Sequence, residues 1–410
     1  MGITTGIFRF AAERNSNRGE VFSSAMVLLG SGLGAVTLIG LPLCLFGGFR
    51  TQAILILVYV LLADVQAVCA QYVRAIDRTR LYAVQGILNT LLTVACNVIF
   101  LAVFQMGVTG YVLAVVVGNL LTTVFLVISA RLWRVFRLSL VRRETVKELL
   151  LFSLPMVPTT VCWLITDLSD RYFVSAICGG VTNGIYSAAY KIPTIVNLLS
   201  SIFMMAWQFS AVTQAADEEE CKRFYSKVFR GFLSLIFAGT AFLLVCSRFL
   251  TTLLLNSAYR EAYRFMPTLL CAAAVESVVS FLATVYLVRK KTVHSFLTAI
   301  AGTLANLLLN AILIPIPHVG ALGAALATLA SYLLVWGLRT WDVPRLLRFR
   351  QYLPRQILNF LLLFSLAAVM TFMECGRLLL SLILALIILA VNVADLLHSF
   401  AGILKRRRVL

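Results

Sequence analysis

The sequence has few charged residues and no long polar segment. Of its 410 residues, 13% are Asp, Glu, Lys or Arg and 61% are hydrophobic, and the mean hydropathy is +0.95. A soluble domain has about 25% charged and about 45–50% apolar residues. The longest polar segments, roughly 131–148, 209–227 and 339–355, are too short to fold alone. The composition therefore excludes a soluble enzyme and predicts an integral membrane protein without a catalytic domain.

Acidic residues are scarce as well. The sequence has 17 Asp and Glu residues and 35 Lys and Arg residues, which gives a net charge of +18. A nucleic-acid-binding surface would carry such charge on a soluble face, beside groove-reading or base-stacking elements. Here the basic residues fall between hydrophobic runs, where membrane topology accounts for them. No nucleic-acid partner is expected.

Patterns that hold metals or nucleophiles are missing. The nine cysteines stand singly, without a C-x-x-C pair, and His294, His318 and His398 are far apart in the sequence. The cysteines are interpreted as small buried hydrophobic residues. Neither a metal, a cofactor nor a catalytic residue is expected.

What the sequence has in abundance is hydrophobic runs long enough to cross a bilayer. A spanning helix needs about 20 predominantly apolar residues. The fold class is therefore all-α, a polytopic membrane protein with about 12 transmembrane helices. The candidate spans are roughly 21–49, 53–73, 81–104, 108–130, 149–176, 184–208, 228–250, 264–287, 293–314, 319–338, 355–373 and 378–400.

The positions of Lys and Arg predict the orientation of these helices. Most of them lie in the N-terminal head and in alternate connecting segments, namely 74–80, 131–147, 221–227, 289–291, 339–355 and 405–408. The positive-inside rule assigns such basic segments to the cytoplasm. Both termini are therefore predicted to be cytoplasmic, which requires an even number of helices.

The sequence also contains an internal repeat. Matching residues recur in the same order at an offset of 213, which pairs Arg78 with Lys291, Asn97 with Asn310, Gly107 with Gly320 and Gly110 with Gly323. Six candidate spans separate equivalent points, so the two halves have the same orientation in the membrane. This pattern is typical of a transporter with two pseudo-symmetric lobes.

The repeat predicts three parts of the chain. They are an N-terminal lobe of four helices at 1–140, a C-terminal lobe of six helices at 141–345, and two additional C-terminal helices with a basic tail at 346–410. Residues 8–25 resemble residues 207–228, yet two spans precede the second segment and none precedes the first. The N-terminal lobe is therefore expected to lack its first two helices, through a truncation or a misassigned start.

Ionisable residues inside a span cost about 2.5–3.5 kcal/mol each on insertion scales, so each requires an explanation. Asp167, Asp170 and Arg171 share one helix face by their i,i+3 and i,i+4 spacing. Lys191 lies about two turns into the next predicted helix, at a comparable depth. The group is either an ion-paired structural link between adjacent helices or a cationic wall of a substrate cavity.

Two further carboxyl groups occupy nearly equivalent places in the two lobes. Asp64 lies 14 residues before Arg78, and Glu276 lies 14 residues before Lys290. A protonatable carboxylate at mid-depth can couple transport to H⁺ or Na⁺. The alternative is a carboxyl group that stays protonated and donates an interhelical hydrogen bond.

Five segments carry a family likeness: DRY at 170–172, GIYSAAYK at 184–191, AWQ at 206–208, FRFAAE at 8–13 and LLLFSLPMVP at 149–158. They resemble the bacterial polysaccharide-biosynthesis, or O-antigen, flippases of the Wzx type, in which a DRY-like segment, GIYSAAYK and AWQ follow one another in this order. That resemblance implies membership of the multidrug/oligosaccharidyl-lipid/polysaccharide flippase superfamily. It also implies two six-helix lobes, often followed by two extra C-terminal helices.

The resemblance implies a function at the bacterial plasma membrane. The expected substrate is an undecaprenyl-diphosphate-linked oligosaccharide, moved by alternating access for O-antigen, capsule or exopolysaccharide synthesis. A polysaccharide polymerase and its chain-length machinery are candidate partners. Arg171 and Lys191 are expected to bind the diphosphate or acidic sugars, while Asp167 and Asp170 hold these cations in place. The expected sugar contacts are Tyr172, Asn183, Tyr186 and Gln208.

Three rival functions follow from the same sequence. A cation-coupled multidrug exporter of this superfamily would favour an acidic cavity, against which the expected Arg171/Lys191 pair argues. A peptidoglycan-precursor flippase is a near relative, and the sequence alone does not distinguish it from a flippase of lipid-linked oligosaccharides. The third rival is a membrane enzyme such as an O-antigen polymerase or a glycosyl- or acyltransferase. A polymerase usually carries a large external loop and an acyltransferase a catalytic His or Asp motif, whereas the predicted external loops are short and the two-lobe repeat favours a transporter.

Overall fold

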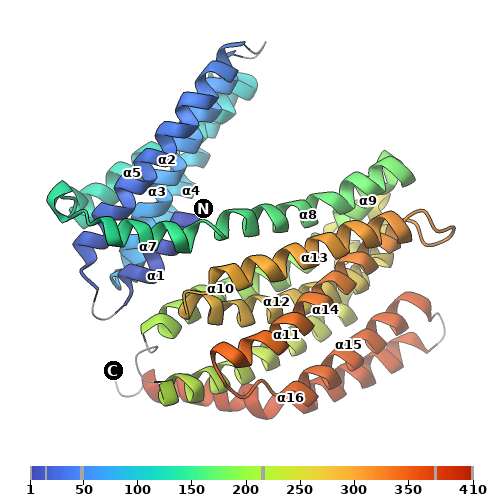
Figure 1. The fold of residues 1–410 in the computed structure, drawn as a ribbon. Coiled ribbons are helices and arrows are strands. Elements are labelled where there is room, and N and C mark those ends of the chain that lie inside the picture. Colours follow the sequence, from blue (N-terminus) through green and yellow to red (C-terminus); the bar gives the residue numbers. More distant parts are fainter. Residues whose placement is uncertain (1, 14–15, 47–49, 214–217, 374–375, 408–410) are drawn as a thin grey trace. The chain divides into compact units, whose positions relative to one another are not determined.

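The computed structural model describes residues 2–13, 16–46, 50–213, 218–373 and 376–407. Almost all of these residues are helical, and twelve helical segments among them are long and apolar enough to cross a membrane. The predicted all-α fold with about 12 membrane-spanning helices is therefore confirmed. The chain forms two compact units, residues 1–157 and 158–410, which are described separately (Figure 1). The orientation of the termini and the limits of the three predicted parts stay predictions.

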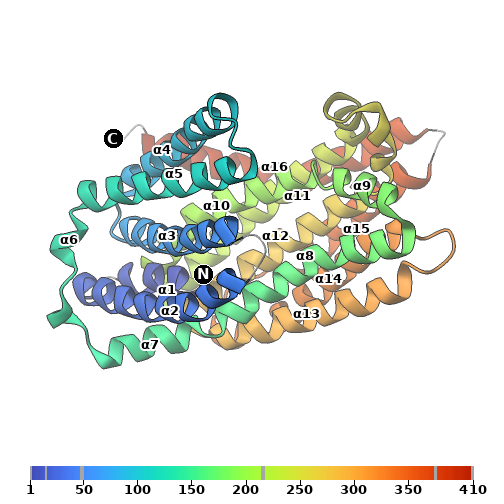
Figure 2. The same cartoon turned by 90° about the horizontal axis from the view of Figure 1, so that it is seen from above.

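Unit 1 is built on four long helices. In this unit α3 packs against α2 and α5, and α4 packs against α5 (Figure 2). The long helices are α2 (Arg18–Phe46), α3 (Arg50–Ala75), α4 (Thr79–Asn97) and α5 (Gly107–Ala130). The shorter elements are α1 (Gly2–Ala11), a π-helix (Val98–Val103), α6 (Leu132–Val135), a 3₁₀ turn (Leu138–Leu140) and α7 (Arg143–Ser153).

The N-terminal segment is a packed helix. Helix α1 contacts α2, α3 and α7, and its side chains Ile7 and Phe8 are buried. A glycine at each of positions 2 and 6 permits this packing, because a Cβ at Gly2 would meet the Ser153 carbonyl oxygen at 2.3 Å. The N-terminal head that precedes the first predicted span therefore contributes to the core of unit 1.

Unit 2 is organised around α12 (Met266–Val288). Of the candidate spans, α12 is the most buried, and it contacts α10, α11, α14 and α15. Small residues at 271–274 (CAAA) let these neighbours approach it closely. The other elements are α8 (Met156–Cys178), α9 (Gly180–Ala189), α10 (Pro193–Thr213), α11 (Glu218–Leu254), a 3₁₀ segment (Ser257–Arg264), α13 (Thr292–Leu313), α14 (Ala321–Leu346), α15 (Leu353–Phe372) and α16 (Arg377–Arg407).

The backbone reproduces the offset of the sequence repeat. Left-handed or otherwise positive φ angles occur in pairs 213 residues apart, at Asp77 (65°) and Lys290 (57°), Gln105 (51°) and His318 (68°), and Gly107 (56°) and Gly320 (50°). The packing recurs as well, since α12 and α13 pack on α14 as α3 and α4 pack on α5. Helices α10 and α12 likewise correspond to α1 and α3. The repeated residues therefore mark the same turns in both units.

Two equivalent glycines let helices approach each other after these turns. A Cβ at Gly323 would lie 2.8 Å from the Leu313 carbonyl carbon and 2.9 Å from its oxygen, and a Cβ at Gly110 would lie 3.2 Å from the Phe100 oxygen. Backbone atoms of a neighbouring helix cannot move aside cheaply. Gly323 is therefore required for the contact between α13 and α14.

We expect Gly323→Ala to destabilise the protein although alanine favours helices by about 1 kcal/mol over glycine. The added methyl group overpacks the contact with Leu313, which costs about 1–3 kcal/mol. Gly337→Ala is the matched control, because Gly337 lies in the same helix and a Cβ there meets no atom within 4 Å. The melting temperature in detergent should be lower than that of wild type for Gly323→Ala alone. Equal melting temperatures for Gly323→Ala and wild type would contradict the packing argument.

Candidate functional site

Asp170 is the centre of a buried polar network in unit 2. Its side chain is 0% exposed and belongs to α8. One carboxylate oxygen accepts hydrogen bonds from the amides of Asn306 (3.2 Å) and Asn310 (2.8 Å). The other accepts from the hydroxyls of Tyr186 (3.0 Å) and Tyr190 (2.9 Å). The Thr328 hydroxyl donates to the same oxygen at 2.5 Å.

The network continues along the contact between α8 and α13. Ser169 donates to Asn306 at 2.7 Å, and the hydroxyls of Thr166 and Thr303 lie 3.0 Å apart. Thr303 also donates to the Cys162 carbonyl at 3.0 Å. Because these polar residues recur at helical spacing on both helices, α8 and α13 are joined by successive hydrogen bonds. In lipid no water replaces such bonds when helices separate.

The hydrogen-bond partners of Asp170 differ from those expected from the sequence. The sequence placed it with Asp167 as a partner of Arg171 and Lys191, whereas its hydrogen-bond donors in the structure are neutral hydroxyls and amides. A carboxylate held by several donors stabilises the elements that supply them. Asp170 therefore fixes α8 against α13, α14 and the segment around Tyr190, and so sets where Asp167 and Arg171 point.

Asp167 and Arg171 line a cavity of about 210 Å³ within unit 2. The cavity is walled by α8, α10, α12 and α14, whose places in unit 2 can be followed in Figure 2. Both side chains are exposed to it, in contrast to Asp170. The other polar side chains that line the cavity are Tyr190, Thr194, Asn197, Glu276, Thr328 and Tyr332.

The charges of this cavity are mixed. The Arg171 guanidinium lies 5.7 Å from the centre of the Tyr190 ring, a cation–π distance. Across the cavity, Asn197 donates a hydrogen bond of 3.1 Å to the Glu276 carboxyl group. One guanidinium therefore shares the space with the carboxyl groups of Asp167 and Glu276, which differs from the cationic wall expected from the sequence.

Lys191 does not line this cavity in the part of the chain that the structure describes. The predicted span 184–208 is divided, since α9 ends at Ala189 and α10 begins at Pro193. Proline has no N–H to continue the helix and its ring clashes with the preceding turn. Lys191 thus lies exposed in the break between two helices, and not two turns into a continuous helix.

The remaining predicted site residues have different surroundings. Tyr186 is fully buried in the Asp170 network, whereas the side chain of Tyr172 is 74% exposed. Gln208 is half-buried on α10. The Asn183 side-chain oxygen is buried without a hydrogen-bond partner among the described residues. Asp64 is half-buried on α3 of unit 1.

A family model described as a polysaccharide biosynthesis protein matches residues 1–208. The chain belongs to the polysaccharide biosynthesis protein family. The match includes α8, with Asp167, Asp170 and Arg171, and extends through α9 and most of α10. A search of curated proteins found no significant match.

Solved structures of transporters share the fold of this family member. A MOP-superfamily transporter from Pyrococcus furiosus, described by a binding pocket of reverse polarity, has a TM-score of 0.69. A multidrug-resistance MATE-family transporter in an outward-facing conformation has a TM-score of 0.71, and a MATE in complex with MaL6 has 0.70. Each is 14% identical, and the alignment covers 84% of both chains. The chain therefore has the fold of these transporters.

Several residues of the Asp170 network in this family member were not predicted from the sequence. Asn306 and Asn310 lie one helical turn apart on α13, and Asn310 had been noted only as a marker of the repeat. The polar positions 303, 306 and 310 form a stripe at helical spacing inside an apolar span. That stripe was the available signal for a buried network, although it does not name Asp170 as its partner.

Proposed function

We propose that the protein moves an undecaprenyl-diphosphate-linked oligosaccharide across the plasma membrane of a bacterium. Transport would proceed by alternating access and would supply surface polysaccharide such as O-antigen, capsule or exopolysaccharide. The observation that carries the proposal is the family match over residues 1–208, within which Arg171 is placed in a polar cavity. The fold shared with MOP-superfamily transporters supports the same class of activity.

The chemistry of such a substrate explains what the protein must provide. A diphosphate with attached sugars does not cross hydrocarbon unaided, because each charge in the bilayer centre is costly. Its lipid tail, in contrast, can remain in the bilayer throughout. The protein therefore has to offer a polar, solvated surface to the headgroup alone.

The size of the cavity limits which part of the substrate it receives. Pockets that enclose a drug-sized ligand measure about 300–1,000 Å³, whereas this one measures about 210 Å³. It accommodates a phosphate or a single sugar but not an oligosaccharide. We therefore propose that Arg171 binds the diphosphate, with Tyr190 beneath its guanidinium. Asp167, one turn away on α8, orients the arginine.

Reconstitution tests the proposal directly. Vesicles that contain the purified protein and a fluorescent undecaprenyl-diphosphate oligosaccharide would be treated with a membrane-impermeant diphosphatase. Without transport only the outer-leaflet substrate is cleaved, and with transport the inner-leaflet pool is cleaved as well. Empty vesicles serve as the control. If the inner-leaflet substrate is protected from the diphosphatase as fully as it is in empty vesicles, the proposed function is refuted.

A second candidate function has one observation in its favour. Asp167 and Glu276 give the cavity of unit 2 two carboxyl groups, as a cation-coupled multidrug exporter would require. Expression in a drug-sensitive host distinguishes the two functions. Resistance to cationic drugs without any effect on the lipid-linked oligosaccharide would favour the exporter.

We expect Glu276→Gln to uncouple transport from an imposed H⁺ or Na⁺ gradient. The amide cannot ionise, yet its oxygen can still accept the hydrogen bond from Asn197, so the local structure is retained. Uptake into vesicles would be compared with and without the gradient. Asp64→Asn makes the same change on α3, the equivalent helix of unit 1, and tests the other predicted coupling residue. A full gradient response in the Glu276 variant would exclude it as the coupling group.

A further inference from the structure

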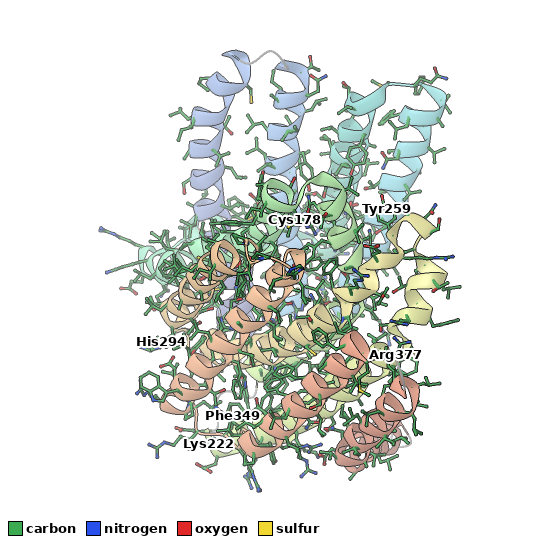
Figure 3. All side chains as sticks on the ribbon, turned by 90° about the vertical axis from the view of Figure 1, so that its right-hand side faces the viewer. Cys178, Lys222, Tyr259, His294, Phe349 and Arg377 are labelled. Atoms are coloured by element: carbon green, nitrogen blue, oxygen red, sulfur yellow. The ribbon has the colours of Figure 1, made fainter. Side chains whose placement is uncertain are left out.

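A second cavity, of about 580 Å³, lies where α11 begins in unit 2. Its walls come from the first turns of α11, from the segment 348–352 that precedes α15, and from α16. Lys222 and Phe349 mark this cavity in Figure 3. Its ionisable side chains are six cations and two carboxylates, namely Lys222, Arg223, Lys227, Arg230, Arg348 and Arg350 with Glu219 and Asp395.

The two carboxylates are already committed to cations. Glu219 lies 2.8 Å from the Lys222 ammonium, and Asp395 lies 2.7 Å from the Arg230 guanidinium. Asp395 also pairs with Arg355, which approaches from outside the cavity lining. The acidic residues therefore neutralise only part of the positive charge, and the cavity keeps a cationic surplus.

Four cations, Arg223, Lys227, Arg348 and Arg350, carry this surplus, and the guanidinium of Arg350 lies 5.1 Å from the centre of the Tyr352 ring. Within the residues that the structure describes, Arg223, Lys227 and Arg348 form neither an ion pair nor a side-chain hydrogen bond, and all three are exposed. Like charges placed around one cavity repel each other unless an anion joins them. Arginine and lysine side chains that have no acidic partner and line a concave surface bind phosphate groups.

The cavity is held in shape by its own packing. Phe349 is 8% exposed and its ring lies 5.4 Å from that of Tyr225 and 5.6 Å from that of Phe229. The backbone N–H of Arg350 donates to the Ser226 hydroxyl at 2.9 Å. Phe349 therefore anchors the segment, while Arg348 and Arg350 on either side of it remain exposed.

The length of α11 places the cavity at the membrane surface. Its 37 residues extend about 55 Å at about 1.5 Å per residue, whereas the hydrocarbon core is about 30 Å thick. The first turns of α11 are polar, whereas residues 231–246 are predominantly apolar, so the first turns lie outside the hydrocarbon. Tyr352 lines the cavity beside Arg350, and tyrosine is enriched at this boundary.

We propose that this basic cavity binds the phosphate group of an anionic membrane lipid. Lipid phosphates lie at the depth where the first turns of α11 leave the hydrocarbon. An anionic headgroup neutralises Arg223, Lys227 and Arg348 without bringing a cation of its own. A choline headgroup would add a positive charge to a cavity that already has too many. The proposal is independent of which substrate the protein transports.

The test is lipid binding by the purified full-length chain in detergent, measured by native mass spectrometry. Dioctanoyl phosphatidylglycerol is titrated against wild type and against R223Q/K227Q/R348Q. We expect the variant to bind the lipid at least about tenfold more weakly, because each basic residue near an anionic lipid strengthens binding. The charge-matched control, R134Q/K147Q/K291Q, removes three exposed cations that lie outside the cavity. Its affinity for the lipid should be within about twofold of that of wild type.

The other arms identify the ligand. Phosphatidylcholine with the same chains should bind no more tightly to wild type than to the variant. Inorganic pyrophosphate should compete only weakly, and competition at equal concentration would assign the cavity to a soluble phosphate compound and overturn the lipid proposal. Equal loss of binding in the control triple variant would also overturn it. If R223Q/K227Q/R348Q fails to fold, Arg348→Gln alone, outside any helix, should still weaken binding about threefold.

Discussion

Replacing Arg171 with alanine is expected to abolish export of surface polysaccharide while the protein still inserts into the membrane. Arg171 supplies the guanidinium of the cavity in unit 2, where it lies over the Tyr190 ring and beside Asp167. Each hydrogen bond that the guanidinium donates to a charged phosphate contributes about 1.5–3 kcal/mol, and the planar fork can donate two. Transport should therefore fall about 30-fold or more. The measurement is surface polysaccharide in a deletion strain that carries the variant.

Matched variants separate a binding role from a structural one. Arg171→Lys keeps the charge but loses the planar fork that grips a phosphate with two donors, so partial activity is expected. Tyr172→Phe changes the next residue, which is 74% exposed, and should leave the amount of membrane-inserted protein unchanged. Wild-type polysaccharide in the Arg171→Ala strain would remove Arg171 from the binding site. Lys191 was also expected to bind the diphosphate, so Lys191→Ala tests whether the break between α9 and α10 contributes a second cation to transport.

Asp170→Ala is expected to lower the stability of unit 2 by about 3 kcal/mol or more. Five donors, from Tyr186, Tyr190, Asn306, Asn310 and Thr328, would lose their acceptor. Hydrogen bonds between membrane helices average about 0.6 kcal/mol each, and buried donors left unsatisfied cost about 1–3 kcal/mol each in soluble proteins. The lower of these scales already gives the expected loss. Thermal unfolding of the purified protein in detergent measures it.

Asp167→Ala is the control for this experiment. Asp167 lies on the same helix, one turn from Asp170, but its side chain is exposed to the cavity. Its removal should leave the melting temperature unchanged, whatever it does to transport. Asp170→Asn should be intermediate, because its oxygen can still accept some of these bonds while its amide adds donors. Equal melting temperatures for Asp170→Ala and wild type would show that the network does not hold α8 in place.

The sequence offered two interpretations for the charged group on α8, and the structure gives its residues different surroundings. Asp170 forms a structural link, although its partners are hydroxyls and amides and not the expected cations. Asp167 and Arg171 line the cavity. Neighbouring positions on a helix are rotated by about 100°, so Asp170 and Arg171 need not share an environment even though both lie near Asp167.

Glu276 shows the opposite case, in which distant residues come together. The sequence paired it with Asp64 by their position in the repeat. The structure places Glu276 in the cavity of unit 2 with Asp167 and Arg171, and gives it Asn197 as a hydrogen-bond partner. Helix α12 brings Glu276 there through its packing against α10 and α14, and no local pattern records those contacts.

The number of spans, the repeat and the family likeness could be read from the amino-acid order alone. An apolar run of about 20 residues is a local property, and an offset of 213 residues survives because both halves need the same tight turns. Burial decides the rest. Which carboxyl group is enclosed by donors and which one faces a cavity depends on neighbours more than a hundred residues away, as the hydrogen bonds that Asn310 and Thr328 donate to Asp170 show.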